Sequence, residues 1–141
     1  MMEITSIKID GFANLDKIEL EIERFNTLVA LNNFGKSNVI NAIDFGIKFI
    51  TASDSSRKSM MAYREVIPIN KEIANRPFSF EIGLTLKLRG KKEQFINYGY
   101  RFEWIRDRKN TGQRITHEFL KVKEKSDRKF TTYMSRNTEG G

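Results

Sequence analysis

The hydrophobic pattern changes to a period of two at Phe78, and this alternation constrains the fold more than any other feature of the chain. Apolar side chains occupy every second position of residues 78–88, and most positions between them are polar or charged. The alternation resumes with Ile96, Tyr98, Tyr100, Phe102 and Trp104. Successive side chains of a strand point to opposite faces of a sheet, so the pattern predicts strands with one buried face.

Short turns connect these strands to two more. Gly90-Lys91-Lys92 and Asn110-Thr111-Gly112 have the composition of hairpin turns, and further strands are expected at 115–123 and 129–135. Strands joined in this way form an antiparallel meander whose apolar face must be covered by another element. The aromatic side chains at 98–104 are therefore expected to line this inner face rather than to form a base-stacking platform.

The first fifty residues predict a hairpin, a buried strand and a helix. Residues 4–10 and 18–23 alternate apolar and polar side chains about a turn, which is typical of a hairpin. The apolar run at 27–30 is expected to form a buried third strand. Apolar side chains at helical spacing predict a helix over 36–50. Gly46 weakens this helix by about 1 kcal/mol relative to alanine, which is acceptable where the helix lies close to a neighbour.

The sequence contains one motif that predicts a binding site, a phosphate-binding loop. Its residues lie between the predicted strand and helix: Asn32, Asn33, Phe34, Gly35, Lys36, Ser37 and Asn38. The order strand, small-residue loop, Lys-Ser and helix is that of a phosphate-binding loop, although Ala30 replaces the first consensus glycine. Backbone N–H groups of the loop would attract phosphate, Lys36 would contact the terminal phosphates, and Ser37 would bind Mg²⁺.

Residues 51–77 show no regular period. The polar run at 51–59 has the composition of a loop, and a short helix is expected at 60–66. Pro68 and Pro77 bracket a second irregular passage.

Composition narrows the class of protein. The chain has 141 residues and no cysteine, which excludes disulfides and cysteine-based metal sites and suits a reducing cytoplasm. No apolar run approaches the roughly 20 residues of a membrane span. The single histidine, His117, lacks the spacing of a metal site and is expected to be structural or exposed.

The net charge of +7 arises after residue 50. Residues 1–50 carry 5 basic and 7 acidic side chains, whereas residues 51–141 carry 20 and 11. Such an excess indicates either a nucleic-acid footprint or a solvated, lysine-rich surface, and composition leaves both open.

The chain resembles the N-terminal lobe of the ABC-type ATPase heads of RecF, SMC-like and OLD-family proteins. The segment Ile4-Thr5-Ser6-Ile7-Lys8-Ile9-Asp10-Gly11-Phe12 resembles the first strand of that family, and residues 32–38 are similar to its phosphate loop. The segments 115–120 and 130–136 resemble the meander of AAA-type ATPases found in phage-defence systems. This resemblance implies an α/β fold, a P-loop NTPase lobe with a mixed sheet, a P-loop helix and then an antiparallel β-meander.

The resemblance divides residues 1–141 into hairpin, loop and helix (1–50), irregular segment (51–77) and meander (78–136). It implies binding of ATP and Mg²⁺ by residues 32–38, closure of the site by a second copy in a head-to-tail dimer, and a position of Asn14 near the nucleotide. Ala13 stands where many relatives have a basic residue.

Two motifs of the family are missing. There is no apolar run ending in Asp-Glu to form a Walker B strand and no LSGG-like signature loop, so no catalytic residue is assigned. We therefore expect the front part of a longer protein, in which a C-terminal lobe or an effector protein completes the ATPase. Its expected setting is cytoplasmic, in DNA metabolism, DNA repair or antiviral defence, with DNA as a further partner.

Two other classes of function compete with this interpretation. One is a non-catalytic nucleic-acid-binding module that uses the basic meander. The other is a small P-loop kinase, which ranks last because neither an arginine-bearing lid nor a carboxylate at a strand end is apparent.

Overall fold

The computed structural model describes residues 2–13, 15, 17–21, 33–69, 76–106 and 114–137, with the backbone alone for 33–37. The elements follow one another along the chain as β1 (Met2–Asp10), β2 (Ile18–Glu21), α1 (Asn33–Thr51), α2 (Asp54–Met61), β3 (Phe78–Leu86), β4 (Gln94–Phe102), β5 (Ile115–Glu124) and β6 (Thr131–Asn137).

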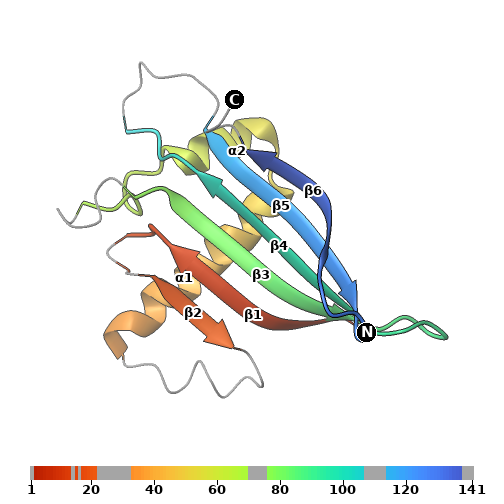
Figure 1. The fold of residues 1–141 in the computed structure, drawn as a ribbon. Helices are drawn as coiled ribbons and strands as arrows, with labels where there is room; N and C mark the ends of the chain where they lie inside the picture. The colour runs from red at the N-terminus through yellow and green to blue at the C-terminus, as the bar shows by residue number, and fades with distance from the viewer. Residues whose placement is uncertain are drawn as a thin grey trace.

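The strands form one six-stranded sheet in the order β2-β1-β3-β4-β5-β6 (Figure 1). Every neighbouring pair is antiparallel. The β1–β2 hairpin and the β3–β6 meander predicted from alternation are both confirmed. They join into a single sheet because β1 pairs with β3, from Met2 opposite Leu86 to Asp10 opposite Ser79, with a register shift between Ile4 and Ser6.

The predicted fold class is wrong. An α/β P-loop NTPase lobe, ABC/SMC-head-like and built on a mixed sheet, was expected, whereas the described residues form a β-rich fold with an entirely antiparallel sheet. Alternating strands joined by short turns pair antiparallel, and a parallel pair needs a crossover. The strand predicted at 27–30 lies outside the described residues.

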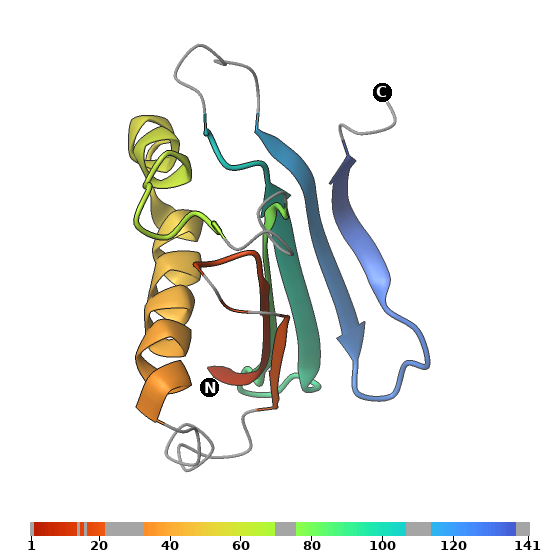
Figure 2. The same ribbon diagram turned by 90° about the vertical axis from the view of Figure 1, so that its left-hand side faces the viewer.

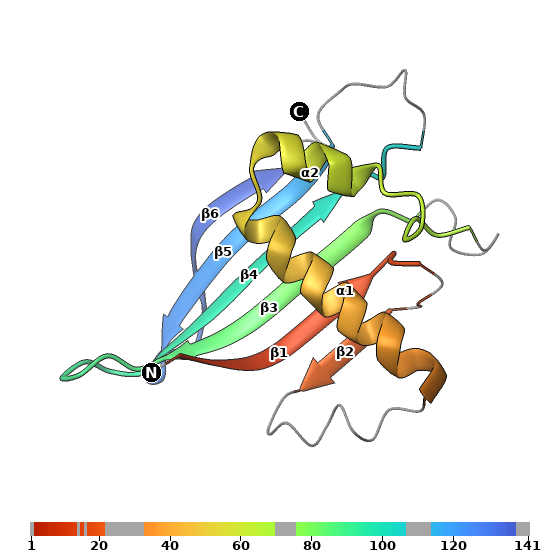
Figure 3. The same cartoon turned by 180° about the vertical axis from the view of Figure 1, so that it is seen from behind.

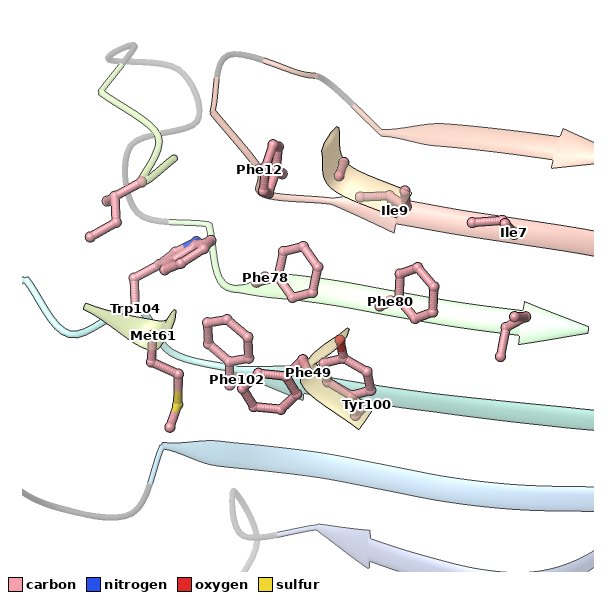
Figure 4. Packing of buried hydrophobic residues seen from close by; sticks show 13 residues of the cluster. Ile7, Ile9, Phe12, Phe49, Met61, Phe78, Phe80, Tyr100, Phe102 and Trp104 are labelled. Atoms are coloured by element: carbon pink, nitrogen blue, oxygen red, sulfur yellow. The ribbon is translucent and has the colours of Figure 1, made fainter. Parts of the chain in front are cut away.

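Both helices of the described residues lie on one side of the sheet (Figures 2 and 3). The face beneath them carries the alternating apolar side chains of β1, β3 and β4, including Ile7, Phe80 and Phe102, each at most 2% exposed. Phe49 of α1 stacks on the rings of Tyr100 and Phe102, with ring centroids 4.9 Å apart in each case (Figure 4). The prediction that the aromatic side chains at 98–104 line the core is therefore confirmed.

Gly46 sets the distance between α1 and the sheet. A Cβ atom at Gly46 would lie 2.2 Å from the ring of Phe80, so only glycine allows the helix to pack this closely. The hydroxyl of Tyr100 donates a hydrogen bond of 2.8 Å to the carbonyl oxygen of Gly46. The expectation that this helical glycine marks a close approach is confirmed.

The turn after β1 is tied to the far end of β4. Gly11 has a φ of +74°, a conformation that glycine adopts without strain. Its carbonyl oxygen accepts a hydrogen bond of 2.8 Å from the indole nitrogen of Trp104, which is buried just beyond β4. This bond links two segments that are distant in the sequence.

The predictions for residues 51–66 are wrong. Most of the expected loop at 51–59 is helix α2, and the helix expected at 60–66 ends instead at Met61. Ser53 starts α2 by accepting a hydrogen bond of 3.3 Å from the N–H of Ser56, and serine is a favourable residue at this position. The polar composition of residues 51–59 does not distinguish a loop from a helix capped by serine.

Arg57 of α2 closes the end of α1. Its guanidinium donates hydrogen bonds of 2.9 and 2.8 Å to the carbonyl oxygens of Phe49 and Ile50 and lies 4.9 Å from the centroid of the Phe49 ring. The last carbonyls of a helix lack partners within the helix, so this contact satisfies them and docks α2 against α1.

We predict that Gly46→Ala destabilises the fold. At an exposed helical site this change gains about 1 kcal/mol, but here the added methyl group meets Phe80, and overpacking of a core costs about 1–3 kcal/mol. Urea denaturation compares the two proteins, with Asn41→Ala on the exposed side of α1 as the matched control. A Gly46→Ala protein more stable than the wild type would contradict the close approach.

We also predict that stability falls above about pH 10. Burial raises the pKa of Tyr100, and burial together with a 2.8 Å hydrogen bond to Glu118 raises the pKa of Tyr98. Below the ordinary tyrosine pKa both side chains stay protonated in the folded and unfolded states. Above it only the unfolded chain ionises them, which favours unfolding.

The measurement is the urea midpoint from about pH 8 to about pH 11, with Tyr100→Phe as the comparison. The urea midpoint should decline less steeply with pH in Tyr100→Phe, because this variant lacks one of the phenols that ionise only in the unfolded chain. A midpoint that stays constant across this range contradicts the assignment.

Candidate functional site

The predicted phosphate-binding segment coincides with the start of α1. The helix begins at Asn33, three residues before the expected Lys36, so Asn33, Phe34 and Gly35 are helical rather than part of a loop. The N–H groups in the first turn of a helix have no acceptor within the helix. In α1 these donors belong to residues 33–36, where the motif places its phosphate contacts.

Only some of the other predicted site residues lie within the described part of the chain. Asn38 is exposed on α1, beside the buried Val39. Asn32, Asn14 and the strand expected at 27–30 lie outside the described residues, as do the side chains of Lys36 and Ser37. The structure therefore brings together the backbone of Asn33 to Ser37, and the side-chain contacts remain predictions.

The electrostatics at the start of α1 suit an anion. The helix has 19 residues and no acidic residue in its first turn. Its single acidic side chain, Asp44, forms an ion pair of 2.8 Å with Lys48 further along the helix. The start of α1 projects at the β2 edge of the sheet (Figure 3). An aligned helix carries about half a positive charge at this end, so a phosphate placed there is favoured.

A metal at this site would depend on Ser37 and the phosphates themselves. Within the described ranges no group of three or more His, Cys, Asp or Glu side chains could hold a metal ion. His117 lies on β5 with its ring 5.5 Å from that of Phe119 and is partly buried. A serine hydroxyl and phosphate oxygens are oxygen ligands of the kind that Mg²⁺ prefers, so the residues of the motif fit this ion.

Opposite the helices, the sheet carries a second set of residues that the sequence-based prediction did not identify. We call it the open face and define it by two rows that pair across β4 and β5: Phe95, Asn97, Gly99 and Arg101 with Lys123, Lys121, Phe119 and His117. None of these residues is acidic. The basic excess of the meander was visible in the sequence and left open a nucleic-acid footprint or a solvated surface, but the sequence did not show which side chains share this face.

A shallow hollow lies beside the open face. Its volume is about 310 Å³, and its lining includes Lys8, Glu81, Gly83, Phe95, Lys123 and Phe130. The side-chain amide of Asn97 donates a hydrogen bond of 2.8 Å to the carboxylate of Glu81 here. Donor and acceptor groups thus lie next to aromatic and cationic side chains.

None of the helices in the described part of the chain is long and apolar enough to cross a membrane. Comparison with protein families and with curated proteins finds no match for this chain.

Proposed function

We propose that residues 32–38 bind the phosphates of ATP together with Mg²⁺. The observation that carries this proposal is the position of Gly35-Lys36-Ser37 at the start of a 19-residue helix whose first turn has no acidic side chain. A Lys-Ser pair in this position supplies a cation for the terminal phosphates and a hydroxyl for the metal.

Three interactions would contribute to binding of the ATP phosphates. N–H groups that have no acceptor within the helix would donate hydrogen bonds to phosphate oxygens, and the helix dipole adds about 0.3–1 kcal/mol for a charge at an exposed helix end. Lys36 adds a charge of its own on the γ-phosphate side. Ala30 opposes these contributions, since it places a Cβ where the consensus has glycine. We therefore propose weak binding, with a Kd on the order of 1 mM.

The wider proposal rests on the resemblance seen in the sequence. In it, the chain takes part in the hydrolysis of ATP by a head-to-tail dimer in the cytoplasm. Groups beyond residues 32–38, or an effector protein, complete the reaction, and the process served is DNA metabolism, repair or antiviral defence. The residues described here bind phosphate in this account and do not catalyse hydrolysis.

We predict that Lys36→Ala weakens binding of Mg²⁺–ATP at least tenfold, because the charge on the terminal phosphates is lost. Phosphorus NMR detects millimolar binding as broadening of the β- and γ-phosphate signals. Lys48→Ala is the matched control, since Lys48 lies at the other end of the same helix, exposed and paired with Asp44. Ser37→Ala should reduce the broadening that depends on Mg²⁺.

Two results would contradict nucleotide binding at this site. One is the absence of broadening with the wild-type protein at millimolar concentrations, and the other is equal broadening with Lys36→Ala and Lys48→Ala.

A further inference from the structure

The open face is the side of the sheet without a helix. Both described helices lie on the other side, where α1 crosses β1, β3 and β4 (Figures 2 and 3). Figure 1 views the sheet from the open side. The side chains of the open face are therefore not part of the core that Phe49 and Phe80 build.

Aromatic rings and ammonium groups alternate on this face. The Nζ atom of Lys121 lies 5.1 Å from the centroid of the Phe119 ring. The Nζ atom of Lys123 lies 5.4 Å from the Phe95 ring and 5.1 Å from the Phe130 ring. A cation at this distance from a ring face interacts favourably with its π-electrons and holds the side chain over the ring.

Gly99 makes room for one of these rings. A Cβ atom at Gly99 would lie 2.6 Å from the ring of Phe119, so the ring leans over the backbone of β4 where a side chain is missing. Phe119 and Phe95 are both partly exposed. The Phe119 ring thus rests on the backbone of β4, and a stacking base would have to displace the flexible lysine side chain from each ring.

The charge of the two rows is of one sign, while Glu81 of β3, opposite Gly99, places a carboxylate beside them. The ionised side chains of the rows are Arg101, Lys121 and Lys123, and the rows contain no carboxylate. On the neighbouring strands, Glu81 accepts a hydrogen bond from Asn97 and Asp10 forms an ion pair of 3.1 Å with Arg76. Glu118 of β5 points to the opposite face, where it accepts a hydrogen bond from Tyr98.

We propose that the open face binds single-stranded nucleic acid. Bases would stack on Phe95 and Phe119, and phosphates would contact Arg101, Lys121 and Lys123. The hollow beside Phe95 would take a base edge against the Asn97–Glu81 pair. Stacked aromatics combined with cations are the chemistry of single-strand recognition, whereas a duplex keeps its bases paired and offers the rings nothing to stack on. This site is separate from the start of α1 and does not depend on nucleotide binding there.

The test is fluorescence anisotropy of a labelled oligothymidylate of about 12 nucleotides, compared with a duplex of equal length at several salt concentrations. The wild-type protein should prefer the single strand. Removing two phosphate contacts with Lys121→Ala/Lys123→Ala should lower the affinity at least tenfold and reduce the slope of log K against log salt by about 1.4.

Phe119→Leu tests stacking independently of charge. It keeps an apolar side chain over Gly99 and should lower affinity about 5- to 150-fold, with an unchanged salt slope. The matched control is Lys91→Ala/Lys92→Ala, which removes the same charge from the exposed turn between β3 and β4. This control should change the affinity less than twofold. Urea denaturation verifies that every variant is folded.

Four outcomes would overturn the proposal. They are no binding at low salt, binding of the duplex at least as tight as the single strand, an unchanged affinity in Phe119→Leu, and an equal loss in the two double-lysine variants. The last outcome indicates attraction of any polyanion to a basic surface rather than a site.

Discussion

The contact between α1 and the sheet at Gly46 is the interaction on which the rest of the structure depends. An antiparallel sheet with one strongly apolar face needs a cover, and a helix covers it well only at short distance. Gly46 permits that distance against Phe80, and the hydroxyl of Tyr100 then bonds to the carbonyl oxygen exposed by the missing side chain. Burial of β3 and β4 on this side follows from the contact.

Covering one side determines what the other side presents. Side chains of a strand alternate between faces, so the burial of Tyr100 and Phe102 directs Gly99 and Arg101 to the open face. The same alternation on β5 places Phe119, Lys121 and Lys123 beside them. A sheet built in this way has one face for stability and one face available for a ligand, while the start of α1 lies at its edge (Figure 3).

The strands were predictable from sequence because their signal is local. The alternation from Phe78 and the turns between strands indicate which strands pair. Gly46 was recognisable because glycine inside a helix is unfavourable unless the helix packs closely against a neighbour. The fold class was not predictable in this way. The Gly35-Lys36-Ser37 motif occupies the start of one helix, and such a motif carries no information on how β1 pairs with β3.

The remaining failures have physical causes. Ser53 caps α2 through its own side chain, a contact that polar composition conceals. Of the phosphate site, the helix was predictable, although it begins at Asn33 rather than Lys36, whereas the side chain of Lys36 and residues 27–32 lie outside the described part. The open face was missed because Phe95 and Phe119 belong to different strands, and only the register between β4 and β5 places them on one surface.

The two faces of this sheet differ in solvent accessibility. Hydroxyl-radical footprinting with mass spectrometry measures this accessibility directly, because oxidation of an aromatic ring requires contact with solvent. Phe130 is 42% exposed and Phe119 partly exposed, whereas Phe80 and Phe102 are 0% exposed. We expect rapid oxidation at Phe119 and Phe130 and protection at Phe80 and Phe102. Equal rates at these four rings would contradict this difference in accessibility.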